Sequence, residues 1–265
     1  MDLNLAGKKA LITGAGKGIG RAIACRLAAE GCDLVLVGRT AADLDAVAAA
    51  LRQKTVHPTR VGTVETMTAD LADTKAVALI AQRHGDVDIL VNNAGNIPGG
   101  SLRDLSDQAW REGWGGKVFG YIDMMRTFLP KMESRRAGVI LNIIGAAGER
   151  PTPEYAAGGS GNAALMALTR GLGGHSPDQG VRILGINPGP VLTERLERLL
   201  QQRAKGRFGD SNRWREMLHA MPFGRAATCD EIADMAAFLV SDRSAYTSGV
   251  IVTIDGGLGA RGTWG

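Results

Sequence analysis

The sequence contains few cysteines and no long apolar run. Its three cysteines, Cys25, Cys32 and Cys229, include no CxxC pair, and an odd number cannot form a complete set of disulfides. We therefore expect reduced thiols with structural roles, as in a cytosolic protein. No segment approaches the roughly 18 consecutive apolar residues that span a bilayer, and residues 1–9 lack the apolar stretch of a signal peptide. These absences predict a cytoplasmic protein with no membrane partner.

The sequence also lacks a large excess of positive or negative charge. The formal net charge is only +4, and the chain has no long basic run and no stripe of basic and aromatic residues, so no nucleic-acid partner is expected. The four histidines stand apart from one another without a cluster of ligands around them. We therefore predict no metal site.

Glycine, in contrast, is abundant, at 37 of 265 residues, which is about 14% and roughly twice the usual share. Short apolar runs alternate with longer amphipathic segments along the whole chain. Unbroken apolar runs are typical of parallel strands buried on both faces, so the alternation predicts a doubly wound α/β sheet. No linker or internal repeat interrupts it, and residues 1–265 are expected to form one domain.

Seven strands and four of the helices can be assigned from this pattern. The predicted strands are Lys9–Thr13, Asp33–Val37, Val64–Thr68, Ile89–Asn92, Val139–Ile143, Val181–Ile186 and Val250–Ile254. The predicted helices are Gly20–Glu30, Ala41–Leu51, Thr74–Arg83 and Ile232–Ser241, and Thr228 with Glu231 forms a capping box that opens the last of them.

The segment between the first predicted strand and the first predicted helix is rich in glycine. It contains Gly14, Gly16, Lys17, Gly18, Ile19 and Gly20. A strand, a glycine-rich turn and a helix in this order indicate a dinucleotide site, because the glycines let a pyrophosphate approach the unpaired N–H groups of the helix N-terminus. The alternative is an ordinary glycine-rich turn.

The end of the second predicted strand decides the type of cofactor. An NAD site of this kind uses a carboxylate there to bind the ribose 2′-hydroxyl, whereas this strand is followed by Arg39 and no acid. Arg39 would attract a 2′-phosphate, with Lys17 as a second cation, and one charge-assisted hydrogen bond contributes roughly 1.5–3 kcal/mol. We therefore predict NADP(H). The alternative is that both side chains are solvated surface cations.

Further motifs follow the glycine-rich turn along the chain. They are Asp70-Leu71, Asn92-Asn93-Ala94-Gly95, Asn187-Pro188-Gly189-Pro190-Val191-x-Thr193, and Ser248-Gly249-Val250 with Asp255-Gly256-Gly257. In order and spacing, over nearly all 265 residues, the chain resembles the short-chain dehydrogenase/reductase family. The resemblance implies a Rossmann-type sheet of seven strands. It also implies that Asp70 and Leu71 lie near the adenine, that Asn92, Ala94 and Gly95 lie beside the cofactor, and that Pro188, Gly189, Val191 and Thr193 surround the nicotinamide amide.

The chain departs from the family pattern at the positions that carry the chemistry. In the family a Tyr transfers the proton, a Lys lowers the pKa of that Tyr, a Ser orients the carbonyl and an Asn holds a water relay. Alignment on the flanking motifs puts Gly158, Asn162, Gly145 and Lys117 at these four positions, in that order. Glycine offers no proton or hydroxyl and asparagine no positive charge. Unless another group substitutes, carbonyl reduction by the family's route should be almost lost.

One substitute lies nearby in the sequence. Tyr155 precedes Gly158 by three residues, about one helical turn, and its side chain is long enough to reach the vacated site. Lys117 would then supply a cation that lowers the pKa of the phenol. The alternatives are a different catalytic arrangement and no catalysis at all. Glu154 and Asn142 are further polar candidates, for which structural roles are the simpler interpretation.

The substrate side is predicted to be covered by a lid around residues 194–225. This segment contains eight bases and four acids, a balance that would suit an anionic substrate such as an acyl thioester, although a solvated pair of amphipathic helices is the simpler explanation. Trp214, Met217 and Leu218 are expected to form the apolar underside of the lid.

Two functions remain open from the sequence. The first is an NADP(H)-dependent oxidoreductase that acts on a small carbonyl or alcohol substrate through a remodelled active site. The second is a non-catalytic nucleotide-binding subunit that stabilises or regulates a partner. The resemblance also implies a homo-tetramer or homodimer, and the glycines of the predicted helix after Tyr155 (Gly158, Gly159, Gly161, Gly171, Gly173 and Gly174) are consistent with close contacts between helices.

Overall fold

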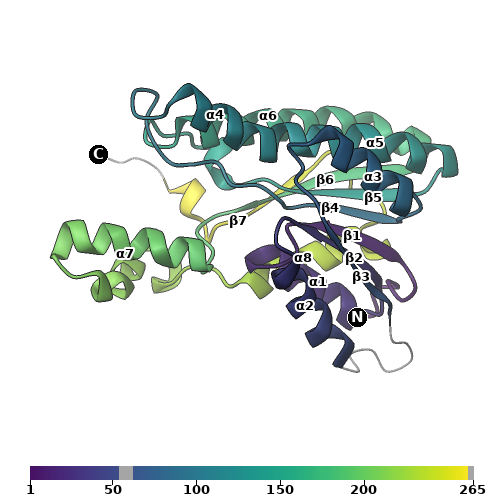
Figure 1. Ribbon diagram of the computed structural model, residues 1–265, viewed down its shortest axis with the longest axis horizontal. Coiled ribbons are helices and arrows are strands. Elements are labelled where there is room, and N and C mark those ends of the chain that lie inside the picture. The colour runs from purple at the N-terminus through teal and green to yellow at the C-terminus, as the bar shows by residue number, and fades with distance from the viewer. Residues whose placement is uncertain (54–61, 262–265) are drawn as a thin grey trace.

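The computed structural model describes residues 1–53 and 62–261. At its centre is one sheet of seven parallel strands in the order β3-β2-β1-β4-β5-β6-β7 (Figure 1). The strands are β1 (Lys9–Thr13), β2 (Asp33–Gly38), β3 (Val64–Thr68), β4 (Ile89–Asn92), β5 (Gly138–Ile143), β6 (Val181–Pro188) and β7 (Ile251–Ile254). All seven predicted strands are therefore confirmed, three of them with the predicted ends and the others with one end that differs by one or two residues.

Eight α-helices connect the described strands and flank the sheet. They are α1 (Gly18–Ala29), α2 (Ala41–Gln53), α3 (Thr74–His84), α4 (Asp107–Trp114), α5 (Gly120–Arg135), α6 (Ala156–His175), α7 (Glu194–Phe208) and α8 (Cys229–Val240). The first helix begins two residues earlier than predicted, because the Arg21 N–H already bonds to the Lys17 carbonyl at 3.2 Å. The predicted capping box of α8 is confirmed, with both reciprocal hydrogen bonds between Thr228 and Glu231.

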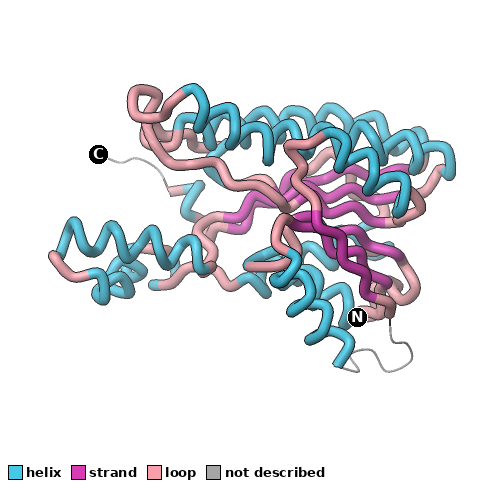
Figure 2. Tube along the Cα trace, in the orientation of Figure 1, coloured by secondary structure: helices cyan, strands magenta, loops and turns pink. Residues whose placement is uncertain are grey.

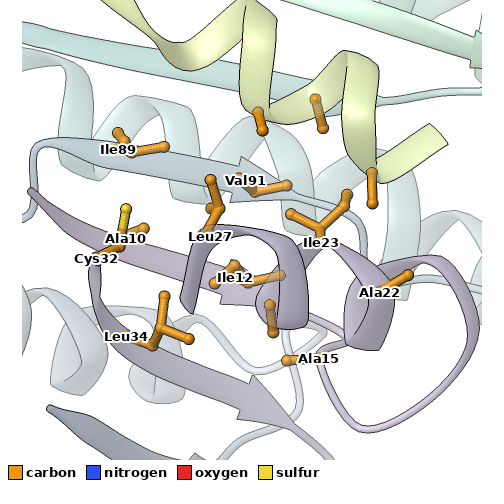
Figure 3. Packing of buried hydrophobic residues seen from close by; sticks show 14 of the residues in the cluster. Ala10, Ile12, Ala15, Ala22, Ile23, Leu27, Cys32, Leu34, Ile89 and Val91 are labelled. Atoms are coloured by element: carbon orange, nitrogen blue, oxygen red, sulfur yellow. The ribbon is translucent and has the colours of Figure 1, made fainter. Parts of the chain in front are cut away.

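The helices cover the two faces of the sheet in two layers. Helices α1, α2 and α8 bury their apolar sides against one face, and Figure 3 shows Ile23 and Leu27 of α1 packed against Ile12 of β1. Helices α3, α5 and α6 cover the opposite face, where the buried side chains include Phe128. The alternating strand residues serve both layers, so the doubly wound α/β fold of Rossmann type is confirmed.

The strand order reverses between β1 and β4, which lie side by side although α1, β2, α2, β3 and α3 separate them in the sequence. In open α/β sheets, ligands bind outside the carboxyl ends of the strands at such a reversal point. The glycine-rich turn after β1 and the Asn-Asn-Ala-Gly segment after β4 both lie at this point. The fold therefore brings the two predicted cofactor motifs together.

The segment predicted as a lid projects from the rest of the molecule (Figures 1 and 2). It consists of α7, a long 3-10 helix (Ser211–Ala220) and a short one (Pro222–Gly224). Trp214 is 5% exposed and packs with Leu200 and Ala204 of α7. Met217 and Leu218 join the same small core, so the three predicted apolar residues hold the segment together internally.

The glycines of α6 are explained largely by contacts within the chain. A Cβ on Gly161 would lie 2.9 Å from Val118 and one on Gly159 would lie 3.0 Å from Pro151, while one on Gly173 would collide with the backbone of β6. Only Gly171 and Gly174, of the six, have open space around them. Close packing inside the protomer thus accounts for most of the pattern that suggested an oligomer, and the oligomeric state stays a prediction.

Among the described residues, no helix is sufficiently long and apolar to cross a bilayer. The same residues contain no cluster of three or more His, Cys, Asp or Glu side chains arranged to hold a metal ion.

Candidate functional site

The glycine-rich turn forms an open cradle at the N-terminus of α1. Gly14 has a φ of +66°, and a Cβ on Gly20 would collide with the Gly14 carbonyl oxygen, so the turn and the helix meet at a distance that only glycine permits. Lys17, the residue before the helix, makes no side-chain cap. The first N–H groups of α1 therefore have no side-chain acceptor from this position and are suited to an anion such as a pyrophosphate.

Thr13 and Asn93 fasten this turn to the end of β4. The Thr13 hydroxyl accepts the N–H groups of Asn93 at 2.9 Å and Ala94 at 3.0 Å. In return, the Asn93 amide donates to the carbonyls of Thr13 at 3.0 Å and Gly14 at 3.2 Å. Asn93 is therefore a positioning residue, a role that its place in the sequence motif does not by itself reveal.

The predicted ribose end of the site lies at the end of β2. Arg39 is exposed there and forms no ion pair within residues 1–53 and 62–261, so its guanidinium is available for a phosphate. Lys17 is also largely exposed, but its ammonium lies 3.1 Å from the Asp43 carboxylate. Asp43 therefore offsets part of the charge that Lys17 was expected to contribute. Asp70 is exposed and accepts the Ala72 N–H at 3.0 Å, and the neighbouring Leu71 is buried.

The segment after β6 meets the glycine-rich turn at the N-terminus of α1. A Cβ on Gly18 would lie 3.3 Å from the Thr193 methyl group, so Thr193 lies directly over the N-terminus of α1. The Thr193 hydroxyl also caps α7 by accepting the Leu196 N–H at 3.3 Å. Gly189 is held at β7 by a hydrogen bond from its N–H to the Ile254 carbonyl at 2.9 Å, and Val191 forms a bridge with Ala227. Pro188 and Val191 are buried, whereas Ile19, in the first turn of α1, is only partly buried.

Gly145 and Asn162, at the family's Ser and Lys positions, lie against each other. The Asn162 amide nitrogen lies 2.9 Å from the point that a Cβ on Gly145 would occupy, so the absence of a side chain at 145 makes room for the amide. Asn162 is 3% exposed, and its Oδ1 has no hydrogen-bond partner among the described residues. A buried acceptor of this kind is costly unless a ligand supplies a donor.

Tyr155 fills the space above Gly158, the family's Tyr position. A Cβ on Gly158 would overlap the Tyr155 ring at Cζ and both neighbouring ring carbons. Tyr155 immediately precedes α6, and its hydroxyl is 3.5 Å from the Ile97 carbonyl oxygen, at the outer limit of a hydrogen bond. The structure therefore places a phenol where the vacated Tyr side chain would begin.

Lys117 lies in a short π-helix (Gly115–Phe119) between α4 and α5. π-helical turns are rare and occur frequently at functional sites. The side chain packs against Gly95, where a Cβ would lie 2.5 Å from the Lys117 Cβ, and the ammonium donates to the Ile144 carbonyl at 2.5 Å. Desolvation lowers the pKa of Lys117 to about 8, with a smaller contribution from the positive charge of Arg195.

The structure brings Lys117 and Tyr155 to the same region but does not join them. The ammonium bonds to Ile144 at the end of β5, whereas the phenol lies at Ile97 after β4, and no hydrogen bond links the two side chains. Tyr121 is the other tyrosine near Lys117, 6.0 Å from its ammonium, but burial strongly raises the pKa of Tyr121 and its hydroxyl donates to Ile143. Tyr155 is therefore the better candidate for a proton donor.

Arg195, from the first turn of α7, completes the group. Its Nη2 donates to the Ile97 carbonyl at 2.9 Å, so Arg195 and Tyr155 meet the same oxygen atom. The sequence showed Arg195 only as one of eight bases in the predicted lid. No local pattern could have distinguished it, because its partner lies 98 residues away in the chain.

Asn142 and Glu154, the further polar candidates, do not face this group. Asn142 is fully buried and accepts a hydrogen bond from Asn92 at 3.0 Å while donating to Thr169 at 3.0 Å. Glu154 is exposed and contributes its backbone carbonyl to the Gly100 N–H at 2.8 Å. Both contacts support the structural interpretation of these residues.

Comparison with known proteins agrees with the fold and the motifs. Residues 8–204 match the family described as short chain dehydrogenase. L-xylulose reductase from Bos taurus is 33% identical over 97% of this chain and 98% of its own length. The 2-keto-3-deoxy-L-fuconate dehydrogenase of Xanthomonas campestris pv. campestris is 32% identical over 97% of this chain and 81% of its own length.

Among solved structures, L-sorbose reductase from Gluconobacter frateurii, complexed with NADPH and L-sorbose, superposes with a TM-score of 0.89. It is 29% identical, and the match covers 98% of this chain and all of the other. The sheet order, the cofactor motifs and these matches over nearly the full length lead to one conclusion: the chain belongs to the short-chain dehydrogenase/reductase family.

Proposed function

We propose that the protein is an NADP(H)-dependent oxidoreductase that interconverts a ketone and a secondary alcohol, with Tyr155 as the proton donor. The observation that carries the proposal is the Tyr155 ring over Gly158. The ring lies where the Cβ of a side chain at position 158 would be, so the glycine at the family's Tyr position is what makes room for Tyr155.

The residues at the glycine-rich turn, at the end of β2 and beside Gly145 fit a dinucleotide cofactor. The cradle at α1 would hold the pyrophosphate, and the unpaired Asn162 Oδ1 would accept a hydrogen bond from a hydroxyl of the cofactor. Arg39, exposed and without an ion pair in the described chain, would bind a ribose 2′-phosphate and so favour NADP(H) over NAD(H). When bound, the cofactor supplies or accepts the hydride.

The protein's own part in the reaction is to orient the carbonyl and to move one proton. During reduction the Tyr155 hydroxyl donates its proton to the substrate oxygen as the C–O bond becomes single, and the phenolate then regains a proton from solvent. Gly145 leaves the substrate oxygen without the hydroxyl that the family provides, so Tyr155 would be the principal hydrogen-bond donor. We propose that Lys117 acts electrostatically, as a nearby cation that favours the phenolate, rather than by direct contact.

The relatives point to polyhydroxy ketones as the substrate class. L-xylulose reductase and L-sorbose reductase are named for neutral ketoses, and 2-keto-3-deoxy-L-fuconate dehydrogenase is named for a keto sugar acid.

A substrate panel tests this proposal. Ketoses, keto sugar acids and acyl thioesters are offered to the protein with NADPH or NADH, and absorbance of the reduced nicotinamide is followed. We expect turnover of at least one ketose or keto acid, with NADPH preferred. Tight NADPH binding without turnover of any panel member would contradict the proposal and favour the non-catalytic nucleotide-binding subunit.

A further inference from the structure

Two cationic side chains converge on the site without an acidic partner. The Lys117 ammonium has one protein acceptor, the Ile144 carbonyl at 2.5 Å, and the Arg195 guanidinium has one, the Ile97 carbonyl at 2.9 Å. Within the described residues, neither takes part in an ion pair. An ammonium carries three donors and a guanidinium five, so most of their capacity is unused.

Other bases of the same segment are placed differently. Arg198 lies 3.9 Å from Glu194, and Arg213 and Arg225 form short ion pairs with Glu216 and Glu231. These pairs are solvent-exposed and neutralise the charge locally. Arg195, in contrast, reaches the loop after β4 and lies near enough to Lys117 to lower its pKa.

Both side chains meet the short segment after β4, since Lys117 packs against Gly95 and Arg195 bonds to the carbonyl of Ile97, two residues further on. Two unpaired cations at one site are unfavourable in the free protein, because they repel each other and Lys117 is also desolvated. A bound anion would offset both costs. The Tyr155 hydroxyl, the proposed proton donor, lies at the same Ile97 carbonyl oxygen as Arg195, so the anion and the reacting carbonyl would lie close together.

We propose that Lys117 and Arg195 bind a carboxylate of the substrate, so that the protein acts on a keto acid and the corresponding hydroxy acid in preference to a neutral ketose. The inference rests on the proposed function, because it assigns the substrate class to the same site. Arg195 follows Thr193 by two residues, so the segment that lies over the N-terminus of α1 also carries the arginine. Binding of the cofactor and of the carboxylate would therefore be coupled.

Dead-end binding tests the carboxylate site without turnover. The protein is loaded with NADP⁺, and calorimetric titration compares pyruvate, acetoacetate and levulinate, which differ in the spacing of ketone and carboxylate, with their methyl esters. We expect at least one acid to bind about tenfold to hundredfold more tightly than its ester, as expected for charge-assisted hydrogen bonds. Arg195→Gln and Lys117→Met should each remove most of that difference, and Arg195→Lys should retain part of it.

Arg198→Gln is the matched control, because Arg198 lies on the same helix and faces Glu194 instead of the site. It should bind the acids as the wild-type protein does. If no acid binds more tightly than its ester, or if Arg195→Gln leaves the preference intact, the carboxylate site is wrong. Turnover of neutral ketoses together with that result would leave the proposed oxidoreductase function standing. An Arg195-dependent preference without turnover of any substrate would instead support the anion site and contradict the proposed reaction.

Discussion

Replacing Lys117 by methionine should change how the stability of the protein depends on pH. The pKa of Lys117 falls from 10.5 to about 8, chiefly because burial desolvates the ammonium. Between about pH 8 and pH 10.5 the unfolded chain therefore binds more protons than the folded one, and the stability of the wild-type protein rises with pH across this window. Below about pH 8 the whole cost applies, and a shift of about 2.5 pKa units corresponds to roughly 3 kcal/mol.

Lys117→Met removes this titration and keeps the apolar stem of the side chain. It also removes the hydrogen bond to Ile144, a loss of roughly 0.5–1.5 kcal/mol that does not vary with pH. The variant should therefore be more stable than the wild type by about 2 kcal/mol at about pH 7. That advantage should shrink by about 2–3 kcal/mol by about pH 10, where the lysine is neutral in the folded protein and only begins to lose its proton in the unfolded chain.

Urea unfolding of both proteins at fixed concentration, at about pH 7 and about pH 10, measures the difference. The exposed Lys75 offers a control, since Lys75→Met should give the same small difference at both pH values. A stability difference between wild type and Lys117→Met that stays constant with pH would refute the reasoning, because it would mean that the ammonium is solvated in the folded protein.

Three other predictions can be tested in solution, two on the site and one on the oligomeric state that the family resemblance implies. Arg39→Asp should reduce or reverse an NADPH preference of at least about tenfold in fluorescence titrations, and equal affinities of the wild-type protein for NADPH and NADH would contradict the assignment. Gly158→Ala should displace the Tyr155 ring and lower turnover about as much as Tyr155→Phe, whereas Gly171→Ala, with open space around it, should keep full activity and gain up to about 1 kcal/mol of stability. Light scattering should show a dimer or tetramer at micromolar concentration, and a monomer would reject the predicted oligomer.

The fold could be predicted because its signals are local. Unbroken runs such as Ile89–Asn92 indicate buried parallel strands whatever surrounds them, and all seven appeared in the structure. The ends of elements were less predictable, since they depend on neighbouring strands. β6, for example, continues to Pro188 because β7 pairs with it as far as Ile254.

In the candidate site, too, the residues placed by local sequence could be predicted and those placed by remote contacts could not. Tyr155 and Gly158 are three residues apart at the start of one helix, so the sequence could indicate that the ring reaches the vacated position. The course of the Lys117 side chain toward Ile144 could not be predicted, because it depends on the π-helical turn and on the space that Gly95 leaves beside it. Arg195 was missed as a site residue because the contact that places it joins two remote segments.

At Lys17 the predicted turn and helix are confirmed, but the predicted free positive charge is not, because Asp43 pairs with it. The sequence indicated a free cation at the glycine-rich turn, but α2 brings Asp43 to 3.1 Å from its ammonium. We therefore expect Arg39 to carry the greater part of the predicted 2′-phosphate recognition. The acid that pairs with Lys17 lies 26 residues further along the chain, and only the packing of α2 beside the turn brings the two together.

The central claim is that the Tyr155 phenol has replaced the family's catalytic tyrosine. Its most direct test is the single-turnover rate of NADPH oxidation by Tyr155→Phe, measured with the best substrate of the panel and compared with Tyr246→Phe, which removes a fully exposed hydroxyl. The account predicts that Tyr155→Phe lowers the rate by about 10²–10⁴-fold with NADPH affinity unchanged, and that Tyr246→Phe changes neither. A Tyr155→Phe variant that oxidises NADPH at the wild-type rate would contradict it.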